Sequence, residues 1–549
     1  MIHNISRFIA ALALLATAQG AWADTETVSY IDADGNEQTV TATVLTGDVT
    51  ADGLSTDVYG DILIPAGWYV VKNSKDGVDA SYTAQLRYTG DNGTIHLILA
   101  DGAEMTVSES TSHAINLDHD YPLAIYGQSG GTGRLTVTGK SKGIVAQGGM
   151  TINGGIVNVT ATGTANAHAI FVMNGITING GQVTATTAGS STGIYVYGAA
   201  LTIGCRKVSD FVSYSSRGGT GTVNIKSGQT LYAGATAYSG NNVSLPSGTV
   251  TLRPYSSDDF SVNDAGTEYT IHTATGWDLF CDMQEAGESF SGKTVALDAD
   301  ITVTRMAGSG DNPFCGNFDG GGNTLTFTAT AADNYCAPFV GVKGGTTADD
   351  ATTIGNLNVV TTITANDYRH MAGLIALQWG HVNVSGCNAT VNISSTVGDN
   401  NPHDLYPAAL VSQASSSDGG TLTVTGCTAS GTISTNGKYA AGLIGIVQGT
   451  ASISDCISSV TIDSSTSSDG THGGIIGTNI GATNIYGTVF NGRLLGNATS
   501  NVGGFIGWRQ GGANIYNSLF IPTEVTVKKD NSATFARNDV DTHNCYYTY

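Results

Sequence analysis

The chain has 549 residues, of which 74 are Gly and only 9 are Pro, and charged residues make up 12%. Its hydrophobic fraction of 40% is too high for an intrinsically disordered chain. The net charge of −22, with 22 Lys and Arg and no dense run of them, argues against nucleic acid binding, which needs a basic face. This acidity favours neutral glycans or protein partners over polyanionic glycans.

Residues 1–23 have the features of a cleavable export signal. An apolar run from Phe8 to about Ala18 precedes an A-x-A cleavage site at 21–23, just before Asp24. The run is shorter than the roughly 20 residues that span a bilayer, and no second long apolar stretch follows. The sequence therefore predicts an exported protein, extracellular or on the outer cell surface, with no transmembrane segment.

Residues 24–93 are expected to form an N-terminal cap with lead-in strands. Their start is polar and Thr-rich, and the stretches 62–71 and 84–88 are predicted strands between turn residues. Repeat arrays require terminal units of this kind, because the first repeat has no neighbour to cover its open end.

Residues 94–256 are predicted to be a first β-helix segment. Ile152, Ile178 and Ile203 follow one another at intervals of 26 and 25 residues. Asn-Gly-Gly at 153–155 and 179–181 suits a sharp corner, since Asn and Gly tolerate positive φ. Short strands, tight corners and this period are typical of a right-handed parallel β-helix. The stretch 208–264 departs from the repeat, with strands predicted at 222–225 and 249–252.

Residues 257–549 are predicted to be a second β-helix segment. A short helix is expected at 276–284, and a first imperfect unit begins at 338. Five units then each begin with a short apolar run, at intervals of 36, 33, 32 and 30 residues. Such a period marks an array in which each unit packs only against its neighbours. The fold class is therefore all-β, a right-handed parallel β-helix in two consecutive solenoid segments. The units start at Gly373, Ala409, Gly442, Gly474 and Gly504.

Cysteine recurs at one position of the second segment. Cys387, Cys427 and Cys456 occupy the same place in three successive units, and Thr488 and Ser518 take the next two places. This pattern favours a column of small buried side chains over metal ligation, which needs a mixed Cys/His spacing that is absent. The sequence leaves a disulfide open between two other cysteines, Cys315 and Cys336.

The candidate carbohydrate-binding residues lie in turns between units of the second segment. Trp379 and Trp508 occupy nearly equivalent places, and Gln448 a comparable one. Indole faces stack on sugar rings, and amide or guanidinium groups bond hydroxyls. The alternative is that these aromatics pack over the coil. Tyr195 and Tyr197 share one strand face, either core or solvent. The predicted site comprises Trp379, Gln378, Trp508, Arg509, Gln510 and Gln448.

Three acidic residues are the candidates for a metal site. Asp118 and Asp120 lie with His119 in the cluster 116–120, and Asp319 lies in the Gly-rich stretch 316–323. Carboxylate oxygens suit Ca²⁺, although a solvated loop and a β-corner are the favoured interpretations of the two stretches. No cofactor is otherwise expected, so Ca²⁺ is the only one that the sequence leaves open.

Catalysis is the main rival to simple binding, because parallel β-helices include polysaccharide lyases and glycosidases. A glycosidase needs two carboxylates about 5–10 Å apart, and residues on successive strands of a solenoid stack about 4.8 Å apart. The aligned repeat positions hold Asn, Thr, Ser, Cys and Gly, while acidic residues scatter through loops. We therefore expect a non-catalytic protein for adhesion or carbohydrate binding. A polysaccharide-active lyase or glycosidase, and a structural surface stalk with protein partners, are the alternatives.

Two sets of motifs resemble known protein groups. HLILADGAEMTV at 96–107, with the ITINGG units, resembles secreted β-helix proteins of gut-type bacteria that are labelled carbohydrate-binding. FCGNFDGGGNTLTF at 314–327, followed by AGLIG and GGIIG, resembles the GLUG-motif repeat proteins of Bacteroidetes-like organisms. The resemblance implies a secreted or cell-surface β-solenoid acting in adhesion or glycan contact, with glycans or host and cell-surface proteins as partners. It supplies no catalytic motif, and AALVSQ at 408–413 departs from the GLIG form.

Overall fold

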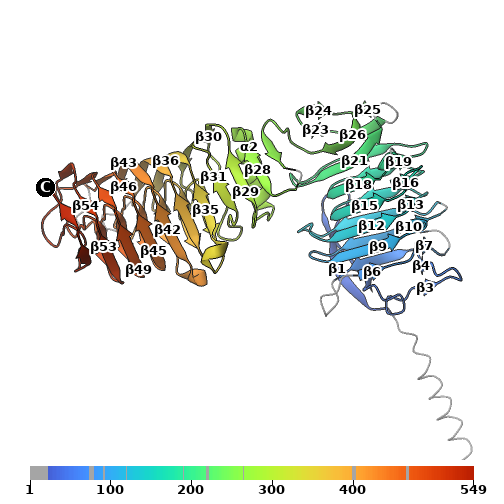
Figure 1. The fold of residues 1–549 in the computed structure, drawn as a ribbon, viewed down its shortest axis with the longest axis horizontal. Helices are drawn as coiled ribbons and strands as arrows, with labels where there is room; N and C mark the ends of the chain where they lie inside the picture. The colour runs from blue at the N-terminus through green and yellow to red at the C-terminus, as the bar shows by residue number, and fades with distance from the viewer. Residues whose placement is uncertain are drawn as a thin grey trace, which may run out of the picture. The chain divides into compact units, whose positions relative to one another are not determined.

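The computed structural model describes residues 23–72, 80–90, 93–118, 120–188, 191–217, 222–263, 265–397, 404–464 and 469–548. The predicted export signal at 1–23 lies, except for its last residue, outside these ranges. Long parallel sheets dominate the described chain, so the predicted β-solenoid class is confirmed. The chain forms two compact units, Met1–Ser256 and Ser257–Tyr549 (Figure 1).

The first unit is built from three sheets, here called A, B and C, whose successive strands come from successive turns of the coil. Sheet A contains β1 (Thr25–Ile31), β2 (Glu37–Leu45), β5 (Gly67–Val71), β8 (Ile95–Leu99), β11 (Leu123–Gly127), β14 (Met150–Ile152), β17 (Ile176–Ile178), β20 (Leu201–Ile203), β22 (Thr222–Ile225) and β25 (Val243–Ser244). Sheet B contains β3 (Ser55–Thr56), β4 (Ile62–Ile64), β7 (Leu86–Tyr88), β10 (His113–Leu117), β13 (Lys142–Ala146), β16 (His168–Val172) and β19 (Ile194–Val196). Sheet C contains β6 (Ala80–Tyr82), β9 (Glu104–Glu109), β12 (Arg134–Gly139), β15 (Ile156–Ala161), β18 (Gln182–Thr187), β21 (Phe211–Arg217) and β26 (Ser247–Leu252).

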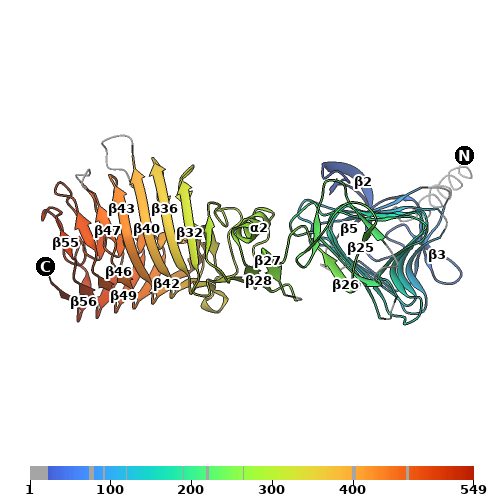
Figure 2. The ribbon, with the colours of Figure 1, turned by 90° about the horizontal axis from the view of Figure 1, so that it is seen from above.

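The second unit has the same plan, with three sheets called D, E and F (Figure 2). Sheet D contains β27 (Phe260–Val262), β28 (Glu268–Ile271), β29 (Thr294–Leu297), β31 (Asn317–Asp319), β35 (Thr352–Gly355), β39 (Val382–Ser385), β42 (Thr421–Thr425), β45 (Thr450–Ser454), β49 (Ala482–Tyr486), β53 (Ala513–Tyr516) and β56 (Asp541–His543). Sheet E contains β30 (Ile301–Val303), β32 (Thr324–Thr330), β36 (Asn358–Asn366), β40 (Asn388–Thr396), β43 (Thr428–Thr435), β46 (Ile457–Ser458), β47 (Thr461–Asp463), β50 (Val489–Phe490), β51 (Arg493–Leu495), β54 (Leu519–Phe520), β55 (Glu524–Val525) and β57 (Tyr546–Tyr547). Sheet F contains β34 (Phe339–Lys343), β38 (Ile375–Trp379), β41 (Val411–Ala414), β44 (Ile444–Val447), β48 (Ile476–Asn479) and β52 (Ile506–Arg509).

Three further pieces complete the fold. The predicted short helix is present as α2 (Ala274–Glu285), which buries Trp277 and Phe280. Two small two-stranded pairs join β23 (Leu231–Ala233) to β24 (Thr236–Tyr238), and β33 (Tyr335–Cys336) to β37 (His370–Met371).

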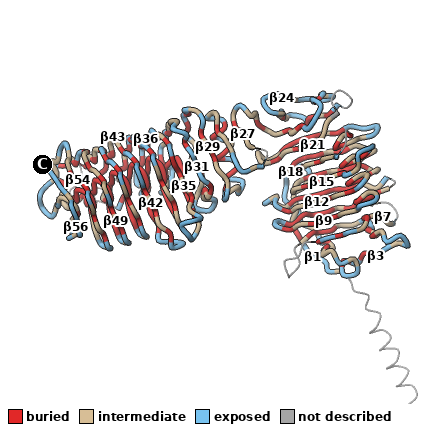
Figure 3. The backbone as a smooth tube through the Cα atoms, in the orientation of Figure 1, coloured by how far each residue is buried: buried red, intermediate tan, exposed pale blue. Residues whose placement is uncertain are grey.

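Apolar side chains at every second strand position fill the core of each unit. Ile152, Ile178 and Ile203 are aligned in register and fully buried. Their neighbours along each strand point outward, so buried and partly exposed positions alternate along the tubes (Figure 3). The sequence repeat thus becomes a stack of identical apolar side chains inside the coil.

The corners of the first unit differ from the sequence expectation in one respect. Gly155 and Gly181 have positive φ values of 81° and 97°, but Asn153 and Asn179 do not adopt that conformation. The two Asn side chains are buried instead, and Asn179 Nδ2 donates to Asn153 Oδ1 at 2.8 Å. Asn is therefore used for a side-chain ladder, while Gly supplies the turn.

The predicted column of small residues in the second unit is confirmed. Cys387, Cys427, Cys456 and Thr488 are fully buried, and Ser518 is nearly so. Each side chain donates to the backbone carbonyl two residues earlier, for example Cys456 Sγ to the Ser454 carbonyl at 3.1 Å. The structure adds a sixth member, because Cys545 makes the same bond. All eight cysteines are free thiols, including Cys315 and Cys336.

Candidate functional site

The two tryptophans of the predicted site are not at equivalent positions. The register of sheet F aligns Trp508 with Leu377, through Gln413 on β41. Trp379 lies two residues further along its strand, where it pairs with Lys343. The four strand steps between β38 and β52 correspond to about 19 Å at the usual spacing of 4.7–4.9 Å. The expectation of nearly equivalent places is therefore wrong, and the two indoles do not form one platform.

Trp508 belongs to a row of stacked rings along the second unit. Its ring lies 6.0 Å from that of Tyr439 at an interplanar angle of 18°, and the Arg537 guanidinium lies 5.5 Å from its centroid. The row continues from Tyr439 through Tyr406 to His370 and Tyr335. Tyr439 and Arg537 therefore occupy the indole face that a sugar would need. This agrees with the alternative that Trp508 packs over the coil.

The predicted polar partners divide between core and surface. Gln378 is 1% exposed, and its Nε2 donates to the Gly380 carbonyl. Arg509 is aligned with Gln378 in the register, and its Nε is buried without a hydrogen-bond partner. The expectation that Gln378 faces a ligand is wrong, because its side chain points into the coil, whereas Arg509 is partly exposed. Gln448 and Gln510 are exposed, and Gln448 Oε1 accepts from Gln413 Nε2 at 2.9 Å.

The candidate metal ligands do not converge. Asp118 lies 3.8 Å from Arg87, Asp120 Oδ1 accepts from Asn174 Nδ2 at 3.3 Å, and Asp319 Oδ1 accepts from the Gly321 amide at 2.9 Å. His119 lies outside the described residues. Within the described ranges, no group of three or more His, Cys, Asp or Glu side chains is arranged to hold a metal ion. The Ca²⁺ site thus stays a prediction without a geometric basis.

Stacked carboxylates were the feature that the catalytic alternative needed. In the registers of the described strands, no Asp or Glu is aligned with another; Glu104 pairs with Arg134, for example, and Arg493 with Glu524. The catalytic hypothesis therefore gains no support from the described sheets.

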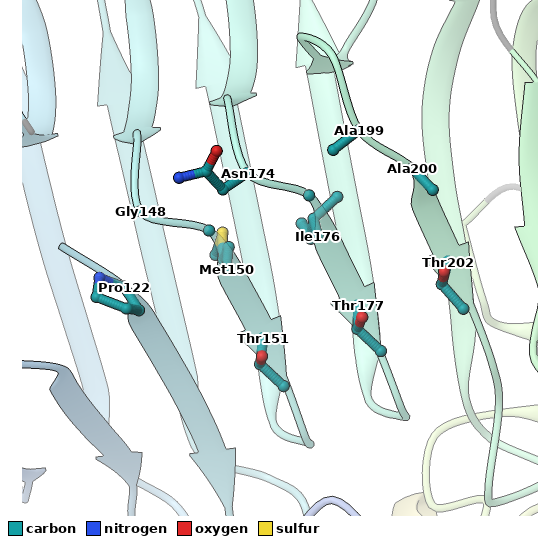
Figure 4. Close-up of a pocket in the computed structure, with 12 residues that line it drawn as sticks. Pro122, Gly148, Met150, Thr151, Asn174, Ile176, Thr177, Ala199, Ala200 and Thr202 are labelled. Carbon is teal, nitrogen blue, oxygen red and sulfur yellow. The ribbon is translucent and has the colours of Figure 1, made fainter. Parts of the chain in front are cut away.

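A groove crosses three successive turns of the first unit, where the chain passes from sheet B into sheet A. It has a volume of about 410 Å³. Thr151, Thr177 and Thr202 stand in one row along it, because β14, β17 and β20 are in register (Figure 4). Small residues open the groove, and none of the lining residues is charged. The lining comprises Pro122, Gly148, Gly149, Met150, Thr151, Asn174, Gly175, Ile176, Thr177, Ala199, Ala200 and Thr202.

Aromatic side chains precede this groove on sheet B. Tyr197, two residues before the groove residue Ala199, is 59% exposed. Tyr195 stacks on Phe171, with centroids 5.6 Å apart at 13°. The question that the sequence left open is thus resolved: this strand face points to solvent. The sequence pattern drew attention to both tyrosines, but not to the groove or its row of threonines, because the corner that creates the groove depends on coil geometry.

Taken together, these features describe a parallel β-solenoid of two units, with an uncharged groove in the first unit. No protein-family model matches the chain, and no curated protein matches it. One solved structure similar to it, from Bacteroides ovatus, is described as a "putative immunoglobulin A1 protease". The likeness covers 52% of this chain and 76% of that one, at 15% identity and a TM-score of 0.30. No helix in the described ranges is both long and apolar enough to cross a membrane.

Proposed function

We propose that the protein is a non-catalytic, exported carbohydrate-binding protein, and that the groove across β14, β17 and β20 binds a neutral glycan. One observation supports this most directly: the groove is lined entirely by uncharged residues on a chain of net charge −22. Exposed Tyr197 precedes the lining residue Ala199 by two positions in the chain. Glycan sites combine apolar or aromatic surface with a few polar groups that fix orientation. Thr151, Thr177 and Thr202 supply hydroxyl groups at a regular interval.

The groove suits an extended ligand because its chemistry repeats along the coil. Each turn contributes a small residue, Gly149, Gly175 or Ala200, followed two residues later by a threonine. Adjacent strands lie about 4.8 Å apart, so a polymer running along the axis meets the same groups at each turn. Tyr197 offers an exposed ring for apolar contact with a sugar face.

The test is binding of an immobilised panel of neutral oligosaccharides by the full chain and two tyrosine variants. Tyr197→Ala is expected to weaken binding about tenfold, which corresponds to about 1.4 kcal/mol. Tyr59→Ala is the matched control, because Tyr59 is 85% exposed in the same unit, at the turn between β3 and β4. Equal affinity of both variants would remove the groove from the proposal.

The two rival functions give different results in the same experiment. Release of reducing or unsaturated sugars from the bound glycans would identify an enzyme instead. Failure to bind any glycan of the panel would favour the structural stalk with protein partners.

A further inference from the structure

One outer face of the second unit is formed almost entirely by Thr, Ser and Asn side chains. β32, β36, β40 and β43 of sheet E lie side by side as long parallel strands (Figure 2). Every outward side chain on these four strands except Val360 is Thr, Ser or Asn. The outward residues are Thr324, Thr326, Thr328, Thr330, Asn358, Val360, Thr362, Thr364, Asn366, Asn388, Thr390, Asn392, Ser394, Thr396, Thr428, Ser430, Thr432 and Ser434. We call this surface the hydroxyl face.

The hydroxyl face is regular in two directions. The strands pair in register over most of their length, so equivalent side chains stack about 4.8 Å apart along the coil axis. Along each strand, outward side chains recur every second residue, about 6.6 Å apart. The result is a flat grid of hydroxyl and amide groups.

Side chains of the hydroxyl face hold one another in place. Thr428 Oγ1 donates to Asn388 Oδ1 at 2.7 Å, and Asn388 Nδ2 donates to Asn358 Oδ1 at 2.8 Å. Asn358 Nδ2 in turn donates to the Gly322 carbonyl at 2.6 Å. A surface ordered in this way loses less conformational entropy on binding than free side chains would.

The chemistry of the face limits what can cover it. It carries no ionisable group, although the chain has 44 Asp and Glu, so neither a basic nor an acidic partner finds a complementary charge. Val360 is its only apolar outward side chain, and a second copy of the chain would need an apolar interface core. Charged groups border the face at both ends. Asp300 Oδ1 accepts from the Thr324 amide at 2.7 Å on one side, and Asp463 and the Arg493–Glu524 ion pair lie on the other. A flat, neutral, repeating surface rich in hydroxyl groups is the complementary partner.

We infer that the hydroxyl face is a second binding surface, specific for the packed chains of an insoluble neutral polysaccharide. Its contacts are individually weak but numerous and equivalent, so a packed polymer surface engages many of them at once. A short soluble oligosaccharide engages few. This surface goes beyond the proposed groove, because it lies in the other unit and favours a different physical form of glycan.

The test is depletion of the full-length protein from solution by insoluble cellulose, chitin and mannan particles. Thr364→Arg with Thr390→Arg places two bulky charges on the hydroxyl face, at exposed positions. Ser417→Arg with Ala498→Arg, at exposed positions outside the sheets of the same unit, is the matched control with the same change of charge. The partition coefficient of the face variant onto at least one of the solids is expected to fall at least tenfold. The control variant is expected to bind like the native chain.

Each other result overturns the inference. Equal binding by the face variant and its control, or no binding of the native chain to any of the solids, removes the hydroxyl face as a polysaccharide surface. A change confined to oligomeric state would assign the face to a second copy of the chain, and a loss of ice-growth inhibition would assign it to ice. Tyr197→Ala separates the two sites, since it is expected to weaken soluble oligosaccharide binding and to leave particle binding unchanged.

Discussion

Two buried histidines of the second unit make its stability depend on pH. His472 is fully enclosed, and its Nδ1 accepts from the Ala440 amide at 3.1 Å. Its proton therefore resides on Nε2, which has no hydrogen-bond partner. Burial lowers the pKa of His472 to about 3, against the opposing effect of Asp469. Burial, aided by the charge of Arg369, lowers the pKa of His370 to about 4.

Proton linkage gives the sign and the size of the pH effect on the free energy of unfolding. In the unfolded chain both imidazoles have a pKa of 6.5, so below that pH the unfolded state binds more protons than the folded state. The free energy of unfolding is therefore at its full value above pH 6.5. It falls steadily as the pH drops toward the folded pKa values. At pH 5 each histidine lowers the free energy of unfolding by about 2 kcal/mol relative to its value at pH 7.5.

The measurement is hydrogen–deuterium exchange of the full chain at pH 7.5 and 5, corrected for the intrinsic exchange rate. Peptides covering 440–479 are expected to lose protection at pH 5. His472→Asn keeps an acceptor for the Ala440 amide but does not titrate, so about 2 kcal/mol of the pH effect should disappear. His543→Asn is the control, because His543 is exposed. An unchanged pH effect in His472→Asn would refute the assignment.

Two further predictions concern packing in the same unit. Gly474→Ala is expected to lower the free energy of unfolding by about 1–3 kcal/mol, because its Cβ would lie 2.3 Å from the Gly504 carbonyl oxygen. Gly512→Ala is the control, because a Cβ there meets nothing within 4 Å, and it should have little effect. Urea titration of both variants measures the two changes in the free energy of unfolding. Trp508→Ala is expected to cost about 2 kcal/mol by thermal denaturation, since the ring is only partly buried. It should leave oligosaccharide binding unchanged, and a loss of binding would restore Trp508 to the site.

The fold could be predicted from the sequence because each level of the pattern repeats. The Ile152, Ile178 and Ile203 spacing sets one turn of the coil, and the structure places all three in one buried stack. The column of Cys387, Cys427 and Cys456 was predictable for the same reason, because a small residue at a fixed place in each unit must face a fixed environment.

The candidate site was less predictable because register is set by local geometry that spacing does not show. The unit spacing predicts nearly equivalent places for Trp379 and Trp508, whereas the strand pairing shifts them by two residues. Gln378 was assigned to the surface by proximity to Trp379, although one strand position turns a side chain from solvent to core. The groove beside Tyr197 arises from a corner between two sheets, which no single stretch of sequence encodes.

The glycine contacts just before β44 and β48 of sheet F also have a mechanical consequence. Gly442 and Gly474 bring neighbouring turns so close that a Cβ on either would overlap a carbonyl oxygen of the next turn. Each turn is thus bonded to its neighbours through three sheets, D, E and F. A force along the strands shears all the hydrogen bonds of a turn together, whereas a force along the coil axis peels turns one at a time from an end. The second unit should therefore resist tearing best when it is pulled across the coil axis, along the strands of sheet E.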